Sequence, residues 1–465
     1  MGRRARRLAV GVVGFVLLTI LTAAIVYAGR VAGIAVAYKA KMLCSGVFVM
    51  RLDSWHVLAD IEIDDLSLLR HVSASIDPAA RSVSASVLGI IRREAVYRDG
   101  LGCSLVYDGK MPPRLPEENE GIRSNAAGWP GREGDLVGSR PALDDTRRER
   151  LGAVLDRAFT EPDLRRPRRT RAVVIVHRGR VVAERYAPGI EPETPLMGWS
   201  MAKTVVNALT GVLVGEGRLL LDRPVPVPEW QTPGDPRGRI TLDHLLRMSS
   251  GLRFDEDMTS PLADVTSMLL GVGDMAAFAA NAELEAEPGT AWRYSSGTSN
   301  IIVRVLRRVL RDDREYLTFP RRALFDRIGM SSAVLETDAA GTFVGSSFMY
   351  ATARDWARLG MLYLQDGVWA GERILPEGWV RYSRSAAPAA PPRLYGAHFW
   401  LDVPDEYRGP GPGLPDGIFH AAGHEGQFVT IVPARETVIV RLGRTRYPAA
   451  WDHAAFVREV LAALD

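Results

Sequence analysis

GWSMAKTVVNALTGVLVGEG, residues 198–217, is the most informative segment of this 465-residue chain. Its apolar residues recur at helical spacing as far as Leu213 and then give way to glycines, which predicts a helix that begins just after Ser200. Ser200 and Lys203 are three positions apart at that start, so both side chains lie on one face of the helix within a turn. The lysine amine can therefore reach the serine hydroxyl.

This pairing of serine with lysine indicates nucleophilic catalysis. Burial disfavours the charged ammonium, and a neutral amine can accept the proton whose loss makes the serine oxygen a better nucleophile. Arginine cannot do this, because a guanidinium keeps its proton in proteins. Of the 58 basic residues four are lysines, and Lys203 is the single lysine after residue 110. We therefore expect Ser200 to be a nucleophile and Lys203 its base; the alternative is a surface lysine on a helix.

A nucleophile elbow of the α/β-hydrolase type is a rival interpretation of residues 198–202. Such an elbow follows a buried parallel strand. The preceding residues 191–196, EPETPL, contain two prolines and do not form a strand of that kind. The elbow is therefore disfavoured.

The rest of the large domain predicts an α+β fold. Four short β-rich runs are bounded by turn residues: 172–176, 181–186, 429–432 and 438–442. A long helical stretch, which includes residues 300–311, separates the first two of these runs from the last two. This order predicts an antiparallel sheet, supplied by both ends of the domain and flanked by helices, with an all-helical subdomain in the middle.

The N-terminus has the pattern of a membrane segment. Residues 1–7 are basic, with four arginines, and residues 8–29 carry no charge, which is long enough to cross about 30 Å of hydrocarbon as a helix. The basic flank predicts a cytoplasmic N-terminus and an extracytoplasmic remainder. A cleaved signal peptide, with a processing site at residues 26–28, is the alternative. We expect export in either case.

Three further regions follow. Residues 30–107 are predicted to be a small β-rich segment, because residues 45–107 alternate polar and apolar in short runs. Residues 108–145 are rich in Pro, Gly, Glu and Arg and predict a linker, and 146–465 form the main domain. Cys44 and Cys103, the two cysteines of the sequence, can close a loop of about 60 residues as a disulfide in an oxidising compartment. Two free buried thiols are the alternative.

The composition excludes several classes of protein. A net charge of +3 over this length gives no field that would attract nucleic acid. With 47% apolar and 24% charged residues the chain has ordinary soluble usage, which does not fit a multi-span membrane protein.

Tyr294 lies in a loop, EPGTAWRYSSG (residues 287–297), whose Pro-Gly and Ser-Ser-Gly predict tight turns. A tyrosine there could move protons beside Ser200 and Lys203, and a nearby ammonium would favour its phenolate form. A structural tyrosine is the alternative.

His424 lies in GHEGQFVTIV (residues 423–432), where glycines precede a strand. His420 and His424 have the spacing of a zinc pair on a helix, but the glycines and the strand argue against a helix, so no metal is expected. A strand that begins at Gly426 could instead direct a backbone N–H at an acyl carbonyl, as an oxyanion hole requires.

Taken in order, SMAK (residues 200–203), YSS (294–296) and HEG (424–426) resemble the three motifs of the serine β-lactamase and penicillin-binding-protein-like superfamily. The nearest branch is the class C β-lactamase-like one, with its esterases and 6-aminohexanoate-dimer hydrolases. ITLDHLLRMSSG (240–251) and the stretch around Trp400 are similar to the same family. The resemblance covers about residues 150–465.

The resemblance implies a β-lactamase/transpeptidase-like fold and an acyl-enzyme mechanism without metal or cofactor. Ser200 would be the nucleophile, Lys203 and Tyr294 would share general base and acid work, and His424 would orient the tyrosine or meet the substrate. The N–H groups of Ser200 and Gln427 would form the oxyanion hole. The substrate would contact Ser296, Gly426, Met258 and Trp400.

The sequence departs from the family pattern where the substrate binds. Penicillin-active members commonly carry Lys-Thr-Gly in place of residues 424–426, and a mostly neutral imidazole attracts a β-lactam carboxylate less than an ammonium does. Ser296 replaces an Asn of class C enzymes, and Met258 replaces a Tyr of nylon-oligomer hydrolases. We therefore expect an exported serine hydrolase for a small ester or amide. The alternatives are a D-amino-acid peptidase or β-lactamase for cell-wall-type peptides, and a catalytically silent sensory module.

Overall fold

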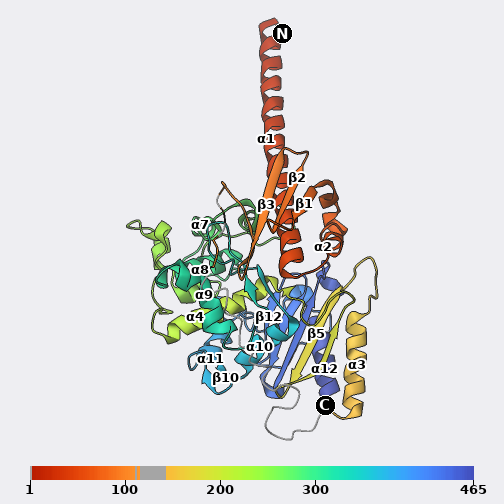
Figure 1. Cartoon of the computed structure of the whole chain (residues 1–465). Coiled ribbons are helices and arrows are strands. Elements are labelled where there is room, and N and C mark those ends of the chain that lie inside the picture. Colours follow the sequence, from red (N-terminus) through yellow and green to blue (C-terminus); the bar gives the residue numbers. More distant parts are fainter. Residues whose placement is uncertain (1–2, 110, 112, 116–142) are drawn as a thin grey trace.

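The main body of the computed structural model is an antiparallel sheet with helices on both faces (Figure 1). The model describes residues 3–109, 111, 113–115 and 143–465. Most of the predicted linker, residues 108–145, and the first two residues of the predicted basic N-terminus therefore lie outside the described residues.

The central sheet has five strands in the order β12-β13-β14-β5-β6. They are β5 (Thr170–His177), β6 (Arg180–Tyr186), β12 (Phe419–Gly423), β13 (Gln427–Val432) and β14 (Thr437–Gly443). Every neighbouring pair is antiparallel, and the pairing of β14 with β5 joins the two ends of the domain. The predicted α+β architecture is confirmed.

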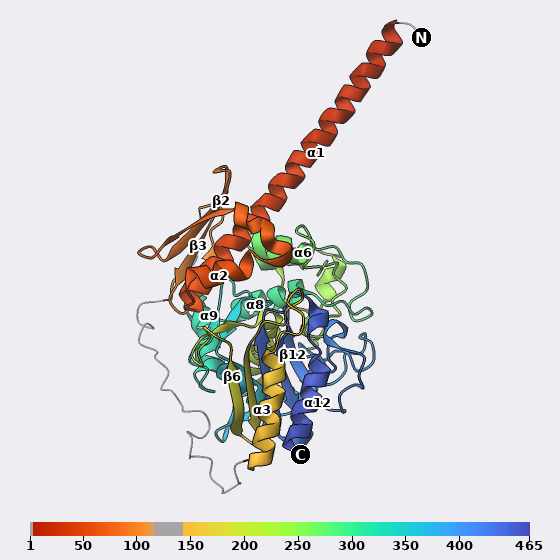
Figure 2. The same ribbon diagram turned by 90° about the vertical axis from the view of Figure 1, so that its right-hand side faces the viewer.

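Helices cover both faces of this sheet because successive strand residues point to opposite sides. Val173 and Ile175 belong to a core cluster with α3 (Asp145–Phe159) and α12 (His453–Leu464), which lie side by side in Figure 2. Val174 and Val176 belong to the other cluster, on the face covered by α10 (Ala353–Leu364).

The residues between β6 and β12 form helices and short strands that are joined by irregular segments. The helices are α4 (Ala202–Gly215), α5 (Leu242–Leu246), α6 (Asp264–Gly271), α7 (Met275–Ala280), α8 (Ser296–Val309), α9 (Asp313–Pro320) and α11 (Trp379–Ser383). The short strands are β7 (Leu196–Met197), β8 (Val334–Leu335), β9 (Met349–Ala351), β10 (Val368–Trp369) and β11 (Glu372–Arg373). Helix α4 begins where the sequence predicts it, just after Ser200, and α8 begins earlier than the predicted residue 300.

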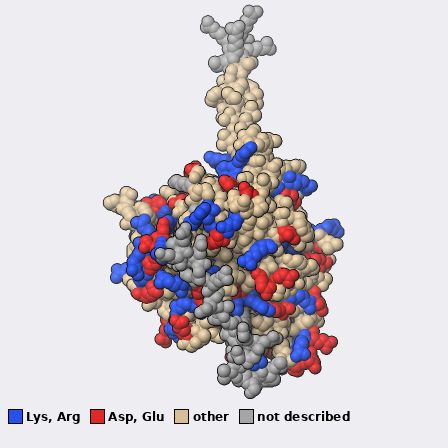
Figure 3. All heavy atoms as spheres, in the orientation of Figure 1, with Lys and Arg blue, Asp and Glu red and all other residues tan. Residues whose placement is uncertain are grey.

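One helix among the described residues, α1 (Arg3–Cys44), is long and apolar enough to cross a membrane. It projects from the body (Figures 1 and 2), and the stretch of this projection that Figure 3 draws in tan shows no charged side chains. Helix α1 extends well beyond the predicted residues 8–29. Its last turns enter the protein core because Val36, Ala40 and Leu43 fall on one helix face and are buried.

The predicted β-rich segment is therefore correct only in its second half. Residues 30–71 form the end of α1, α2 (Ser54–Ile61) and short irregular turns, and the strands are β1 (Ser73–Asp77), β2 (Ser82–Val87), β3 (Ile91–Arg98) and β4 (Gly102–Leu105). A Cys44–Cys103 disulfide joins the end of α1 to β4, with the Cα atoms 6.1 Å apart. Lys41 forms a buried ion pair with Glu336 of the main domain, so this segment shares the core of that domain.

Candidate active site

The Ser200–Lys203 pair lies at the start of α4. Lys203 Nζ is 2.9 Å from Ser200 Oγ, 3.1 Å from Ser296 Oγ and 3.1 Å from the carbonyl oxygen of Ser346. Lys203 is 1% exposed, whereas Ser200 is half-buried and so can meet a substrate. Trp199, just before the serine, has a φ of 48°, a left-handed conformation that is strained for a side chain of its size.

Burial gives Lys203 the properties of a base. It lowers the pKa of the ammonium to about 8, against the opposing effect of the Glu256 carboxylate, because a buried charge loses its hydration. At pH 7 about a tenth of this lysine is therefore an uncharged amine in contact with the serine hydroxyl.

Glu256 is a functional candidate that the sequence reasoning missed. Its carboxylate accepts hydrogen bonds from Ser296 N at 2.7 Å and from Ser296 Oγ, and so reaches Lys203 through that hydroxyl. The neighbouring Asp255 and Asp257 are exposed, as expected of a solvated loop. The period-two pattern of Phe254, Glu256 and Met258, all at least partly buried, is a signal that could have identified it.

Ser296 does not occupy a substrate wall, contrary to the prediction. Its side chain is 1% exposed and lies between Lys203 and Glu256. Ser296 is therefore part of the hydrogen-bond network around Lys203. A hydroxyl is small enough to fit there and can donate to one partner while accepting from the other.

Tyr294 is brought to the same site by the loop before α8. Its ring centroid is 4.8 Å from Lys203 Nζ. Burial, together with the Glu256 charge, raises the pKa of the Tyr294 hydroxyl, and a hydrogen bond with Ser200 only partly opposes this rise. The expected preference for phenolate is thus reversed, and the structure favours a neutral phenol that can donate a proton.

An aromatic cluster extends from Tyr294. The Trp400 ring centroid is 5.3 Å from that of Tyr294, and Trp292 and Tyr395 pack against Trp400 with centroid separations of 6.3 and 5.2 Å. Trp400 is half-buried, so this group offers a partly accessible apolar surface beside Ser200.

The end of β12 packs against the segment that carries Ser200. A Cβ on Gly423 would lie 2.2 Å from the carbonyl oxygen of Gly198 and 3.2 Å from Ser200 N, so glycine allows this close approach. His420 exchanges backbone hydrogen bonds with Trp400 at the outer edge of the sheet. Backbone N–H groups two residues apart point to the same side of a strand. The N–H of His424, four residues after His420, therefore points to the same outer edge of the sheet as the N–H of His420.

Gln427, the predicted second oxyanion donor, is placed differently. It lies on β13, between β12 and β14, and its side-chain amide donates to the carbonyl oxygen of Gly443 at 2.7 Å. The hairpin turns before Gln427, so the residue that directly follows Gly423, the glycine packed against residues 198–200, is His424.

The remaining predicted residues lie close by. His424 is half-buried and stands edge-on to Trp199, with ring centroids 5.4 Å apart. Gly426, predicted to contact substrate, instead has a φ of 78° in the hairpin turn, and its N–H donates to Tyr407 Oη at 2.9 Å. Met258 packs against the core with part of its side chain exposed.

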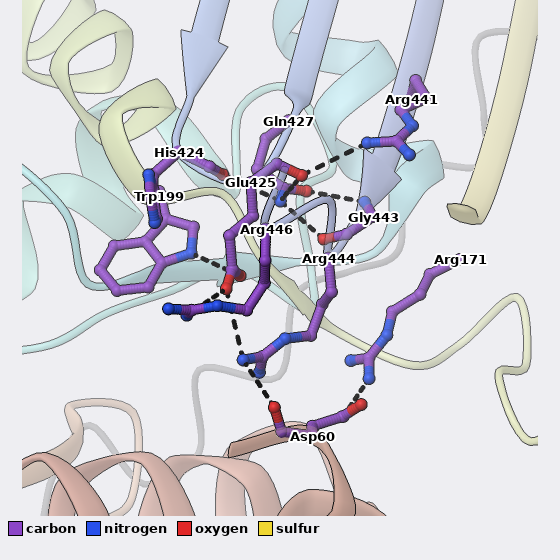
Figure 4. Close-up of polar contacts among 10 residues, drawn as sticks. All are labelled: Asp60, Arg171, Trp199, His424, Glu425, Gln427, Arg441, Gly443, Arg444 and Arg446. Atoms are coloured by element: carbon purple, nitrogen blue, oxygen red, sulfur yellow. Dashed lines mark hydrogen bonds and ion pairs between the residues drawn. The ribbon is translucent and has the colours of Figure 1, made fainter. Parts of the chain in front are cut away.

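Behind these residues Glu425 is buried in a network of charges (Figure 4). Burial alone would raise its pKa, but Arg444, His424 and Arg446 outweigh that effect and the pKa falls to about 2. Glu425 therefore stays ionised under all ordinary conditions.

The fold and the Ser200–Lys203 pair define the class of protein: a serine hydrolase with a β-lactamase-like fold. The chain belongs to the Beta-lactamase family, whose model matches residues 155–463. It is 26% identical over 298 residues to a 6-aminohexanoate-dimer hydrolase from Paenarthrobacter ureafaciens, a match that covers 59% of this chain and 72% of that protein.

Solved structures share the fold. A Bacillus anthracis protein proposed to be a 6-aminohexanoate-dimer hydrolase has a TM-score of 0.53 at 23% identity, over 68% of this chain and 80% of its own. EstCE1, a hydrolase with promiscuous acyltransferase activity, has a TM-score of 0.52 at 17% identity, over 69% of this chain and 98% of its own.

Proposed function

We propose that this protein hydrolyses small esters or amides through an acyl-enzyme formed on Ser200. The observation that carries the proposal is the contact of Lys203 Nζ with Ser200 Oγ at 2.9 Å, made by a lysine whose pKa is about 8. At pH 7 about a tenth of such a lysine is neutral, which suffices for general base catalysis.

In the acylation step, Lys203 takes the hydroxyl proton while Ser200 Oγ forms a bond to the acyl carbon. Collapse of the tetrahedral intermediate breaks the bond to the leaving group. The leaving group receives a proton from the neutral Tyr294 hydroxyl, which is replenished from the Lys203 ammonium. In deacylation, a water molecule gives a proton to Lys203 and its oxygen forms a bond to the acyl carbon. The bond from Ser200 Oγ to the acyl carbon then breaks, and the Lys203 ammonium returns the proton to Ser200 Oγ.

The oxyanion of each tetrahedral intermediate would accept hydrogen bonds from the N–H groups of Ser200 and His424. Support comes from the close packing of Gly423 against residues 198–200 and from the direction of alternate N–H groups in β12. In this proposal His424 acts through its backbone, and its imidazole lines the site.

The substrate would place an apolar group against Trp400 and its aromatic neighbours, with Met258 as a further contact. Ala421 and Ala422 precede Gly423 on β12, so this strand end offers no side-chain charge to a carboxylate. That supports neutral esters and amides over β-lactams. The relative that acts on 6-aminohexanoate dimers supports an amide among the substrates.

We further propose that α1 anchors the enzyme in a membrane with the catalytic domain on the extracytoplasmic side. Twelve large apolar side chains from Val10 to Tyr27 are exposed, and a disulfide in the following segment suits an oxidising compartment. If processing occurs after Ala28, the same domain would be secreted.

A fluorophosphonate probe followed by mass spectrometry tests the nucleophile. We expect an adduct on Ser200 in the folded protein and none in Ser200→Ala; an unmodified Ser200 in folded wild type would refute the proposal.

A panel of p-nitrophenyl esters, nitrocefin and D-Ala peptides then defines the substrate. Ester turnover that disappears in Lys203→Arg supports the proposal, since arginine keeps the charge and cannot act as base. Turnover of D-Ala peptides alone would instead indicate a D-amino-acid peptidase.

A further inference from the structure

Glu425, in the hairpin turn between β12 and β13, makes a contact that the catalytic proposal does not use. Its Oε2 accepts a hydrogen bond from the indole Nε1 of Trp199 at 3.2 Å (Figure 4). Trp199 precedes Ser200, and Glu425 follows His424. A single buried carboxylate therefore ties together the neighbours of both proposed oxyanion donors.

Both ends of this contact have a backbone conformation that needs support. Trp199 has a φ of 48° and Glu425 a φ of 62°, and left-handed conformations are unfavourable for residues other than glycine. The side-chain bond between them, and the bond from Thr445 N to the carbonyl oxygen of Glu425 at 3.0 Å, hold these conformations in place.

The other carboxylate oxygen of Glu425 contacts two arginines. Oε1 lies 3.3 Å from Arg444 Nη2 and 3.3 Å from Arg446 Nη1, on the segment that follows β14. Arg444 Nη2 also donates to the backbone carbonyl of Asp60 at 3.2 Å. Asp60 belongs to α2, in the segment that connects the apolar helix to the main domain (Figure 4).

Asp60 is itself fixed to the sheet. Its carboxylate forms an ion pair with Arg171 of β5, and both side chains are largely buried. The Tyr38 hydroxyl of α1 lies within electrostatic reach of Arg444 as well. Arg444 is thus held between Glu425 on one side and residues 38–60 on the other.

We propose that Glu425 is a positioning residue for the oxyanion hole, and that the N-terminal segment (residues 30–107) supports the active site through Asp60 and Arg444. The family model begins at residue 155, so this segment lies outside the matched region. The inference rests on the acyl-enzyme mechanism proposed above. It adds that the membrane-proximal segment is part of the catalytic apparatus as well as a connection to the anchor.

The first test is Glu425→Gln, in the full chain in detergent or nanodiscs. Glutamine keeps an acceptor for Trp199 and removes the charge that holds the arginines. We expect kcat for an ester to fall about 10- to 100-fold with KM within about twofold, because misplaced N–H donors weaken binding of the transition state more than that of the substrate. A purely structural role would lower the melting temperature and leave kcat per folded molecule unchanged.

Two variants at the C-terminal end of α2 test the support from the N-terminal segment, and they avoid the risk that Glu425→Gln fails to fold. Asp60→Asn breaks the ion pair with Arg171, and Glu62→Gln is the matched control, because it breaks the Lys39–Glu62 ion pair of the same segment. We expect Asp60→Asn to lower kcat about 3- to 10-fold and Glu62→Gln to leave it unchanged. Equal kcat values in the two variants would overturn the proposal that the N-terminal segment supports the active site.

The fluorophosphonate reaction separates this inference from the proposed function. In Glu425→Gln we expect a slower but complete adduct on Ser200, since the phosphoryl oxygen uses the same N–H donors. Wild-type labelling rates in Glu425→Gln and Asp60→Asn would refute the inference alone, whereas a lack of adduct in wild type would refute the acyl-enzyme mechanism.

Discussion

Replacing Glu256 with glutamine should move the pH dependence of kcat/KM to lower pH. In the proposed mechanism the active form has a neutral Lys203, so activity rises with pH through the pKa of that lysine, about 8. The Glu256 carboxylate raises this pKa and burial lowers it. Without the carboxylate only the effect of burial remains, and the pKa falls further.

The size of the shift follows from the geometry. Lys203 Nζ and the Glu256 carboxylate are bridged by Ser296 Oγ, and two hydrogen bonds in series put the charges roughly 5 Å apart. At an effective dielectric constant of about 20 their interaction is about 3 kcal/mol, or roughly two pKa units; in bulk water it would be about 0.6 units. We expect a shift of about one unit, between these two limits, because Lys203 is buried and the site opens to solvent at Ser200.

The assay is hydrolysis of a p-nitrophenyl ester over about pH 5 to 10, followed at a wavelength that does not depend on ionisation of the product. Asp257→Asn is the matched control, since it removes an equal charge from the adjacent, exposed position. A rising limb that stays in place or moves to higher pH in Glu256→Gln would refute the assignment of that limb to Lys203.

Three further predictions concern packing and stability. Gly423→Ala should lower kcat about 100-fold, since the new Cβ would displace the Ser200 segment, while Gly413→Ala, where a Cβ has open space, should leave kcat unchanged in the same ester assay. Lys41→Met should destabilise the fold by about 3–5 kcal/mol in urea titrations, because it leaves Glu336 buried without its counter-ion; adding Glu336→Gln should recover part of that loss. Opening the disulfide, which closes a loop with a sequence separation of 59, should cost about 4 kcal/mol in the same titrations.

The sequence predicts the parts of the site that depend on local geometry. Helical spacing alone places Lys203 beside Ser200, and strand alternation with turn residues predicts the antiparallel sheet. The period-two pattern of residues 254–258 could mark Glu256 as partly buried, but its partner Ser296, 40 residues further along the chain, could not be found in this way. The same limit applies to the second oxyanion donor: whether His424 or Gln427 faces Ser200 depends on the length of a hairpin turn, and a shift by a few residues moves the donor to another strand.

The length of α1 was underestimated for a different reason. The uncharged run ends at Gly29, which suggests the end of a membrane segment, but the helical periodicity continues through Val36 and Leu43 into the interior. A run of residues without charge indicates contact with lipid, whereas the helical periodicity of apolar residues indicates contact with the protein core. A helix that passes from one to the other changes its charge pattern without ending.

The rarity of lysine in this chain can now be explained in part. The three lysines whose surroundings are described, Lys39, Lys41 and Lys203, are all at least 96% buried by side chain or residue, whereas arginines supply the exposed positive charge. Lys39 and Lys41 each contact a carboxylate directly. A compact ammonium fits such interior positions, where a planar guanidinium would need more space and more acceptors.

Burial is therefore common to these lysines, and the indirect position of its carboxylate distinguishes Lys203. Glu256 reaches Lys203 only through the Ser296 hydroxyl, so the ammonium charge is compensated more weakly than by a contact ion pair. Burial lowers the pKa of Lys203 to about 8, and it also lowers the pKa of Lys41, which contacts Glu336 directly. The difference between the two lysines is in their partners: Ser200 Oγ takes one of the donor positions of Lys203 that a carboxylate would otherwise fill. Burial thus accounts for the basicity of Lys203, and the hydroxyl between Lys203 and Glu256 accounts for its access to the nucleophile.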